Sequence, residues 1–162
     1  MAKTNAVRFL EANNVKHSTL TYEVDESDLS GITVANKVGV DPEKVFKTLV
    51  TRGDKNPATA GQAGINVFCI PVTEELDLKK AAKASGNKKI EMIKEKELLP
   101  LTGYIKGGCS PIGMRKKFPT YINETAQLFD EIYISAGLIG MQIKLNLFDL
   151  LKIVDGALVD LT

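Results

Sequence analysis

The stretch Val45-Phe46-Lys47-Thr48-Leu49-Val50 of this 162-residue chain is a mostly apolar run that contains one lysine. In a strand, successive side chains alternate between two faces, so the first, third and fifth residues share one face and the others share the opposite face. Both faces are mostly apolar, which predicts a strand over residues 46–52 that is covered on both sides. A second apolar run at 65–72 predicts another strand. The segment 53–64 between them is rich in Gly, Ala, Asn and Pro, and it predicts a long mobile hairpin connection.

Outside this hairpin, helical and extended patterns alternate irregularly. Thr4, Asp41 and Asp77 suit helix N-caps, and Gly39 and Gly86 suit helix C-termini. The expected helices are 5–13, 32–38, 78–86, 95–99 and 147–154, with further strands at 17–24, 89–93, 120–122, 131–135 and 141–145. This order predicts one α+β domain over residues 1–162, in which a mixed, curved, barrel-like β-sheet is flanked by short helices.

The composition is that of a soluble globular protein, with 44% hydrophobic and 25% charged residues. No window approaches the roughly 18 uninterrupted apolar residues of a membrane helix. The first five residues lead into an amphipathic helical pattern and not into the apolar block of a signal peptide. Two cysteines, Cys69 and Cys109, are too few for a disulfide framework. We therefore expect a cytoplasmic protein that does not associate with membranes.

The formal net charge of +1 is unevenly distributed. Residues 1–78 contain 8 Lys/Arg and 11 Asp/Glu, residues 79–117 contain 11 and 3, and residues 118–162 contain 2 and 6. A basic middle between acidic flanks suits contact with a phosphate backbone on one face. Lysine-rich helices that are merely solvated would give the same pattern, so charge alone does not identify a polyanion as the ligand.

Lys47 is the most informative single residue, because it interrupts an apolar strand. A buried ammonium without a partner is unstable, so this side chain must either extend to water or meet an anion. If it stays in a pocket, it is a cation aimed at a phosphate, a carboxylate or a developing oxyanion.

The densest turn signal contains Gly107-Gly108-Cys109-Ser110-Pro111-Ile112-Gly113. Glycines permit left-handed backbone angles and close approach, so successive N–H groups can converge on a charged oxygen, as in an oxyanion hole or a sugar cradle. Most such loops only turn the chain, and no Gly-Lys-Ser/Thr ending marks a P-loop. Ser135-Ala136-Gly137 offers a second rim of small residues. Tyr22 is either a core aromatic or a pocket residue that stacks on a base.

Cys109 is a candidate nucleophile, since backbone donors in a glycine loop can lower a thiol pKa. A cysteine hydrolase also needs a base, and the single histidine, His17, is expected on the polar face of its strand. Cys69 fits core packing. No Ser-His-Asp triad and no metal-ligand spacing is apparent. An enzyme of this kind would position a reactive ester and let water or a substrate group attack it.

Seven stretches in chain order resemble the YbaK-type tRNA(Pro) deacylases, which are relatives of the editing domain inserted in bacterial prolyl-tRNA synthetases. Together they extend over nearly the whole chain. They are Lys3-Thr4-Asn5-Ala6-Val7, Val45-Phe46-Lys47-Thr48-Leu49, Leu76-Asp77-Leu78-Lys79-Lys80, Lys88-Lys89-Ile90-Glu91-Met92, Thr102-Gly103-Tyr104, Gly107-Gly108-Cys109-Ser110-Pro111-Ile112-Gly113 and Ile132-Tyr133-Ile134-Ser135-Ala136-Gly137.

The resemblance implies an α+β editing-domain fold and hydrolysis of the ester that joins cysteine to the 3′-terminal adenosine of tRNA(Pro). It implies no metal and no cofactor, action alongside prolyl-tRNA synthetase, and attack by the cysteine thiol or a ribose hydroxyl of the substrate. The family's essential lysine corresponds to Lys47. The expected catalytic set is Lys47, Gly107 and Gly108, and the expected substrate-binding set is Tyr22, Cys109, Ser110, Pro111, Gly113, Ser135, Ala136 and Gly137.

Two departures from the family pattern concern the second rim. Leu138-Ile139 stands where members often have Lys-Arg, and Gln142 stands where some have an acidic residue. The first weakens a phosphate-binding role for this rim, and the second removes a possible acid near the pocket. Neither departure affects Lys47 or the glycine-rich loop, so deacylase activity is still expected, while the amino-acid specificity is left open. Three alternatives remain: a deacylase of another mischarged tRNA such as Ala-tRNA(Pro), a non-catalytic module that binds tRNA or a synthetase, and a thiol hydrolase using Cys109.

Overall fold

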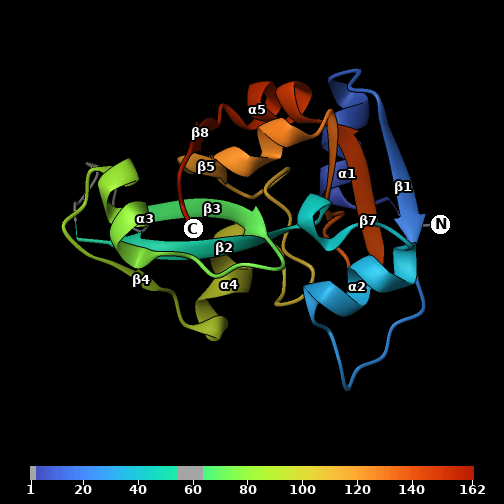
Figure 1. Cartoon of the computed structure of the whole chain (residues 1–162), viewed down its shortest axis with the longest axis horizontal. Helices are drawn as coiled ribbons and strands as arrows, with labels where there is room; N and C mark the ends of the chain where they lie inside the picture. Colours follow the sequence, from blue (N-terminus) through green and yellow to red (C-terminus); the bar gives the residue numbers. More distant parts are fainter. Residues whose placement is uncertain (1–2, 55–63) are drawn as a thin grey trace.

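The computed structural model describes residues 3–54 and 64–162 (Figure 1). The predicted mobile connection 53–64 falls mostly on residues 55–63, which lie outside the described residues. The strands form two sheets of five and three strands, with short helices packed around them. The α+β class is thereby confirmed. In the described residues neither sheet closes into a barrel, and an isolated bridge between Val45 and Tyr133 connects the two.

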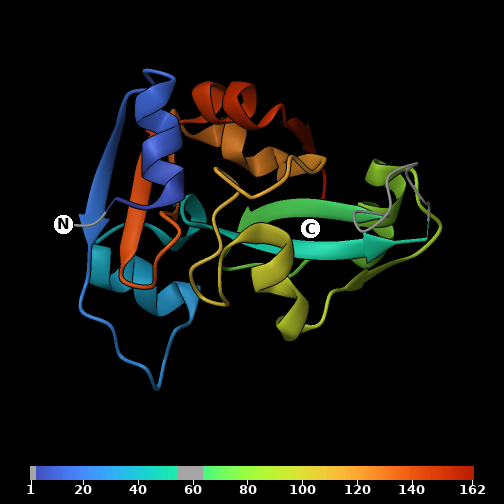
Figure 2. The same cartoon turned by 180° about the vertical axis from the view of Figure 1, so that it is seen from behind.

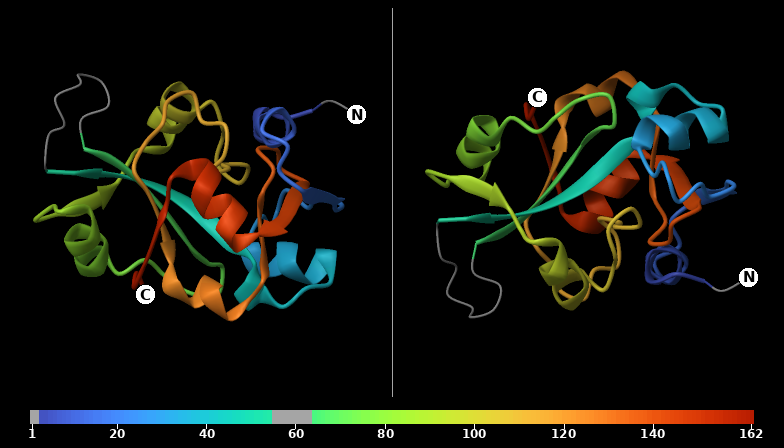
Figure 3. Two further views of the ribbon diagram at one scale, coloured as in Figure 1. Left: turned by 90° about the horizontal axis from the view of Figure 1, so that it is seen from above. Right: turned by 90° about the horizontal axis from the view of Figure 1, so that it is seen from below.

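The five-stranded sheet has the order β4-β2-β3-β5-β8. Its centre is the predicted hairpin of β2 (Phe46–Gly53) and β3 (Ile65–Pro71), and β3 is buried along its whole length. Antiparallel β4 (Ile90–Met92) joins β2, and β5 (Thr120–Asn123) runs parallel to β3. The sheet is therefore mixed, as predicted, and β2 crosses the molecule from the end near α2 to the end near β4 (Figure 3).

The three-stranded sheet is antiparallel and has the order β1-β7-β6, with β1 at His17–Thr21, β6 at Glu131–Ser135 and β7 at Met141–Asn146. Helices α1 (Asn5–Ala12) and α5 (Leu147–Val154) pack their apolar faces on this sheet. The largest core cluster joins residues of both helices and of β6 and β7. Figure 2 shows α1 lying against one face of this sheet. Burial of this apolar surface holds the N- and C-terminal thirds of the chain together.

Three more helices are α2 (Gly31–Val38), α3 (Leu78–Ser85) and α4 (Glu95–Thr102), and a 3₁₀ turn, η1, spans Pro42–Lys44. The predicted caps hold: the side chains of Thr4, Asp41 and Asp77 accept backbone N–H bonds, and Gly39 and Gly86 are left-handed.

Some predicted boundaries were wrong. Helix α4 continues through Pro100, because Gly103 N donates to the Leu99 carbonyl at 2.9 Å and the Thr102 hydroxyl donates to the Leu98 carbonyl. Strand β1 ends at Thr21 and not at residue 24, because its partner β7 begins at Met141. The sequence patterns also missed the 3₁₀ helix η2 (Glu124–Leu128) and the short strand β8 (Ala157–Val159).

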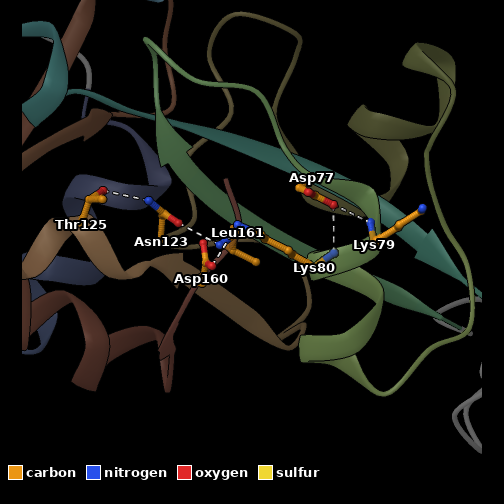
Figure 4. A network of polar contacts seen from close by, with 7 residues as sticks. All are labelled: Asp77, Lys79, Lys80, Asn123, Thr125, Asp160 and Leu161. Carbon is orange, nitrogen blue, oxygen red and sulfur yellow. Dashed lines mark hydrogen bonds and ion pairs between the residues drawn. The ribbon is translucent and has the colours of Figure 1, made fainter.

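Strand β8 is held in place by polar contacts of the C-terminal residues (Figure 4). Buried Asn123 accepts from Leu161 N at 2.9 Å and donates to the Thr125 hydroxyl. Asp160 pairs with Lys80 of α3, and Asp77 N donates to the Leu161 carbonyl. These contacts satisfy buried backbone groups that a short edge strand would leave unpaired.

Candidate functional site

A cavity of about 450 Å³ opens along β2, between the two sheets. Its walls include the run Val45–Val50, Tyr22 after β1, Leu98 of α4, and Ser135 and Gln142 from the smaller sheet. Gly107 and Cys109 of the glycine-rich loop complete the lining. A volume of this size suits a small ligand or the end of a larger one. The cavity thus brings together five predicted site residues that are far apart in the sequence, namely Tyr22, Lys47, Gly107, Cys109 and Ser135.

Lys47 lies on the cavity wall and is partly buried, in a strand whose residues Phe46 and Val50 are deeply buried. No ion pair with Lys47 occurs among residues 3–54 and 64–162. Lys47 therefore lies at a cavity, and none of the described acidic side chains pairs with it. A cation in this position attracts a phosphate or a developing oxyanion.

The glycine-rich loop follows α4 and passes beside the turn between β6 and β7. Gly107 is exposed at the cavity in a left-handed conformation, with φ of 86°. The N–H of Gly108 donates to the Ile105 carbonyl at 3.0 Å, so it closes a turn and is not available to a ligand in this conformation. Within the described part of the chain, the N–H groups of Gly107 and Cys109 have no such partner. Unlike the Gly108 N–H, these two groups have no internal partner that would compete with a ligand.

The other predicted loop residues do not line the cavity. Ser110, Pro111 and Ala136 are buried, and the Ser110 hydroxyl accepts from Ile112 N. Gly113 and Gly137 pack against the Tyr104 side chain, at distances that a Cβ atom would make too short. In this structure these five residues support the loop by packing away from the cavity.

The sequence patterns assigned no role to Tyr104. Its hydroxyl donates to the Ile112 carbonyl at 2.6 Å, and burial raises the pKa of the phenol, which keeps it a neutral donor. Gly113 and Gly137 both depend on the space that its ring leaves. An aromatic residue between glycines, in a stretch shared with a known family, was the available signal.

Cys109 lines the cavity, but its chemistry is that of a packed thiol. Burial raises the pKa of the thiol to about 12, so the thiolate is scarce at neutral pH. His17 does not line the cavity, and its ring nitrogen Nδ1 is hydrogen-bonded to the Val15 carbonyl oxygen at 2.8 Å. The hypothesis of Cys–His catalysis is therefore not supported by the geometry.

We expect Cys109→Ser to keep its hydrolytic activity within about threefold of the wild-type value, because the thiol is neither ionised nor paired with a base. The measurement is kcat/KM on the substrate proposed below, with reactivity toward iodoacetamide at pH 7 as a parallel readout. A loss of two orders of magnitude in activity would restore the thiol-hydrolase alternative.

Lysines at the cavity edge are a feature that sequence reasoning did not assign. Lys94 and Lys106 are exposed and line the cavity, and neither has an ion pair among the residues described. Among the described residues, Glu95 is the single acidic residue of the lining. Glu97 is not part of the lining and pairs with Arg52 at 2.9 Å. The excess of lysine in residues 79–117 was the signal, but it did not show which lysines meet at one site.

Residues 30–153 match the family model of the aminoacyl-tRNA editing domain. This chain belongs to that family. A candidate Cys-tRNA(Pro)/Cys-tRNA(Cys) deacylase of Enterococcus faecalis, EbsC, is 47% identical over 160 residues, which cover 99% of this chain and 93% of the relative. The family resemblance of the seven sequence stretches is thereby confirmed.

Solved structures agree on the fold. A candidate trans-editing enzyme for prolyl-tRNA synthetase superposes with a TM-score of 0.83 at 23% identity, covering 100% of this chain and 99% of the other. A second protein, described only as hypothetical, has a TM-score of 0.84 at 16% identity and coverage of 98% and 99%. At these identities the likeness shows an editing-domain fold over the full chain. No helix in the described residues has the length and apolar character needed to cross a membrane.

Proposed function

We propose that this protein is a trans-editing deacylase that hydrolyses the ester of mischarged Cys-tRNA(Pro). The observation that carries the proposal is a cation, Lys47, in a cavity that is also lined by Gly107 and Cys109, whose N–H groups have no hydrogen-bond partner among the described residues. Membership of the editing-domain family and the name of the Enterococcus faecalis relative support the same activity.

The chemistry proposed for this site is stabilisation of charge on an ester. Attack on the carbonyl carbon turns its oxygen into an oxyanion, which the Gly107 and Cys109 N–H groups and the Lys47 ammonium would stabilise. The bond to the ribose 3′-oxygen then breaks, and that oxygen takes a proton. Because the lining contains no histidine and its thiol is protonated, the attacking group comes from the substrate or from water. Attack by the cysteinyl thiol would expel the ribose 3′-oxygen and leave a cyclic thioester, which water then opens. The neighbouring ribose 2′-hydroxyl would instead assist an attacking water, since its own attack on the carbonyl would only move the acyl group to the 2′-oxygen.

The cellular setting follows from the substrate. A tRNA(Pro) charged with the wrong amino acid leaves prolyl-tRNA synthetase, so we propose that this protein acts alongside that enzyme in the cytoplasm. A small domain that takes part of its tRNA specificity from a synthetase does not need a strongly basic surface, which agrees with the net charge of +1.

Lys94 and Lys106 are proposed to contact the phosphates next to the terminal adenosine. Lys106→Glu should raise KM for the charged tRNA roughly tenfold with little change in kcat, because a phosphate contact is lost and repulsion is added. The measurement is steady-state deacylation at two salt concentrations, and the defect should shrink at high salt.

The matched control is Lys83→Glu, an exposed lysine of α3 that belongs to the same basic segment but not to the cavity. It should leave KM almost unchanged. Equal defects in the two variants would show that general charge, and not the cavity edge, determines tRNA binding.

The test of the proposed function is a panel of charged tRNAs incubated with the purified protein. Faster release of cysteine from tRNA(Pro) than of proline supports the proposal, and release of alanine would assign the broader substrate range. Cysteine on its own tRNA(Cys) belongs in the panel, because the name of the relative includes it. Binding of tRNA without hydrolysis of any ester would identify a non-catalytic module.

A further inference from the structure

Gln142 carries a buried polar atom that the fold does not use. It lies in β7 opposite Ser135 of β6, it is 6% exposed, and it lines the cavity. Its side-chain oxygen Oε1 is buried and has no hydrogen-bond partner among the residues described. Buried acceptors are nearly always paired, because an unpaired one loses its bonds to water without compensation. Because Gln142 lines the cavity, rotation of its side-chain amide would bring this unpaired oxygen to a ligand that supplies the missing donor.

The neighbours of Gln142 do not supply the missing donor. Ser135 lies opposite Gln142, but no hydrogen bond joins its hydroxyl to Gln142 Oε1, and the hydroxyl accepts from Gly137 N at 3.1 Å. The remaining polar groups of the lining include the ammonium groups of Lys47, Lys94 and Lys106 and the free N–H groups of the glycine-rich loop. The cavity thus has several hydrogen-bond donors and positive charges, which suit the anionic or acceptor atoms of a ligand. Gln142 Oε1 is a buried acceptor, which suits a donor group of the ligand.

An aminoacyl ester presents the complementary set of groups. Its phosphate and carbonyl oxygens suit the lysines and the N–H donors, and its α-ammonium group is a donor with charge. A charged donor strengthens a hydrogen bond and makes it selective. A neutral amide accepts this bond without adding negative charge to a cavity that must also admit RNA phosphates.

We propose that Gln142 is a specificity-determining residue whose Oε1 accepts a hydrogen bond from the free α-ammonium group of the aminoacyl substrate. The inference rests on the proposed function and specifies it further: the site takes acyl groups with a free amine and discriminates against esters whose amine is blocked or missing. Such discrimination protects N-acylated and peptidyl-tRNAs from hydrolysis.

The test compares two stable amide probes of 3′-amino-3′-deoxyadenosine, one carrying cysteine and the other carrying 3-mercaptopropionate, which lacks the α-amine. Wild-type protein should bind the cysteinyl probe about tenfold more tightly. In Gln142→Met, this preference should disappear through weaker binding of the cysteinyl probe alone. Gln142→Glu, which keeps an acceptor, should retain the preference.

The unliganded Gln142→Met variant should also melt at a higher temperature than wild type, because the unpaired buried oxygen is gone. A residue that merely supported the fold would give a lower melting temperature. Loss of affinity for both probes alike, no preference in the wild-type protein, or no binding of either probe would overturn the inference. A failure of the proposed function is recognised separately, since the tRNA panel would then show no hydrolysis at all.

Discussion

Replacing Lys47 by methionine should lower kcat/KM for Cys-tRNA(Pro) by about 10²–10³-fold, the typical effect of removing one oxyanion-stabilising donor. The lysine lines the cavity from the central strand β2, and no described acidic residue pairs with it. Methionine keeps the length and apolar stem of the side chain, so the strand and the cavity wall should stay in place. Single-turnover deacylation measures the effect on the chemical step without interference from product release.

Two controls separate chemistry from folding in this experiment. The melting temperature of Lys47→Met should equal or exceed that of wild type, because a partly buried charge has been removed. Lys47→Arg keeps the charge but changes its shape, so it should recover part of the activity. Wild-type rates in Lys47→Met would show that this cation has no part in the reaction.

Gly113→Ala should lower the free energy of unfolding by about 3 kcal/mol and reduce deacylation in parallel. The residue has φ of 73°, where alanine is strained by about 1–2 kcal/mol. A Cβ atom would also lie 2.9 Å from the backbone of Asn5 and 3.0 Å from the Tyr104 hydroxyl. Relieving those contacts must move the loop or helix α1, which adds roughly 1–3 kcal/mol.

Gly39→Ala is the matched control, because Gly39 has φ of 74° but no atom within 4 Å of an added Cβ. It should cost only the conformational strain, about 1–2 kcal/mol, and leave activity intact. Urea unfolding of both variants gives the comparison. Equal destabilisation would mean that the loop is not held against α1 as the structure indicates.

Much of the fold follows from local patterns. The apolar alternation around Lys47 predicted β2, and the side chains of Thr4 and Asp77 form the predicted helix caps. Local signals failed where distant residues decide the outcome. The end of β1 depends on where β7 begins, and β8 forms because the C-terminal residues are tied to Asn123.

The candidate site was predictable as a set of residues but not as an arrangement. The glycine-rich sequence indicated free backbone donors but not which ones. In the folded loop the Gly108 N–H closes a turn, whereas those of Gly107 and Cys109 have no hydrogen-bond partner among the described residues. The excess of lysine in residues 79–117 did not show that Lys94 and Lys106 lie at the cavity, because the approach of α4 to the cavity is a tertiary contact. Gln142 was noted as a departure from the family, and its unpaired oxygen emerged only from the packing.

We propose that Lys47 at the cavity supports hydrolysis of a misattached cysteine. The most direct test of this proposal is the single-turnover release of cysteine from Cys-tRNA(Pro) by wild-type protein and by folded Lys47→Met. Rapid release by the wild type and a rate near the spontaneous one with the variant are the predicted results. Release at the spontaneous rate with wild-type protein, or equal fast rates with both proteins, would contradict the claim.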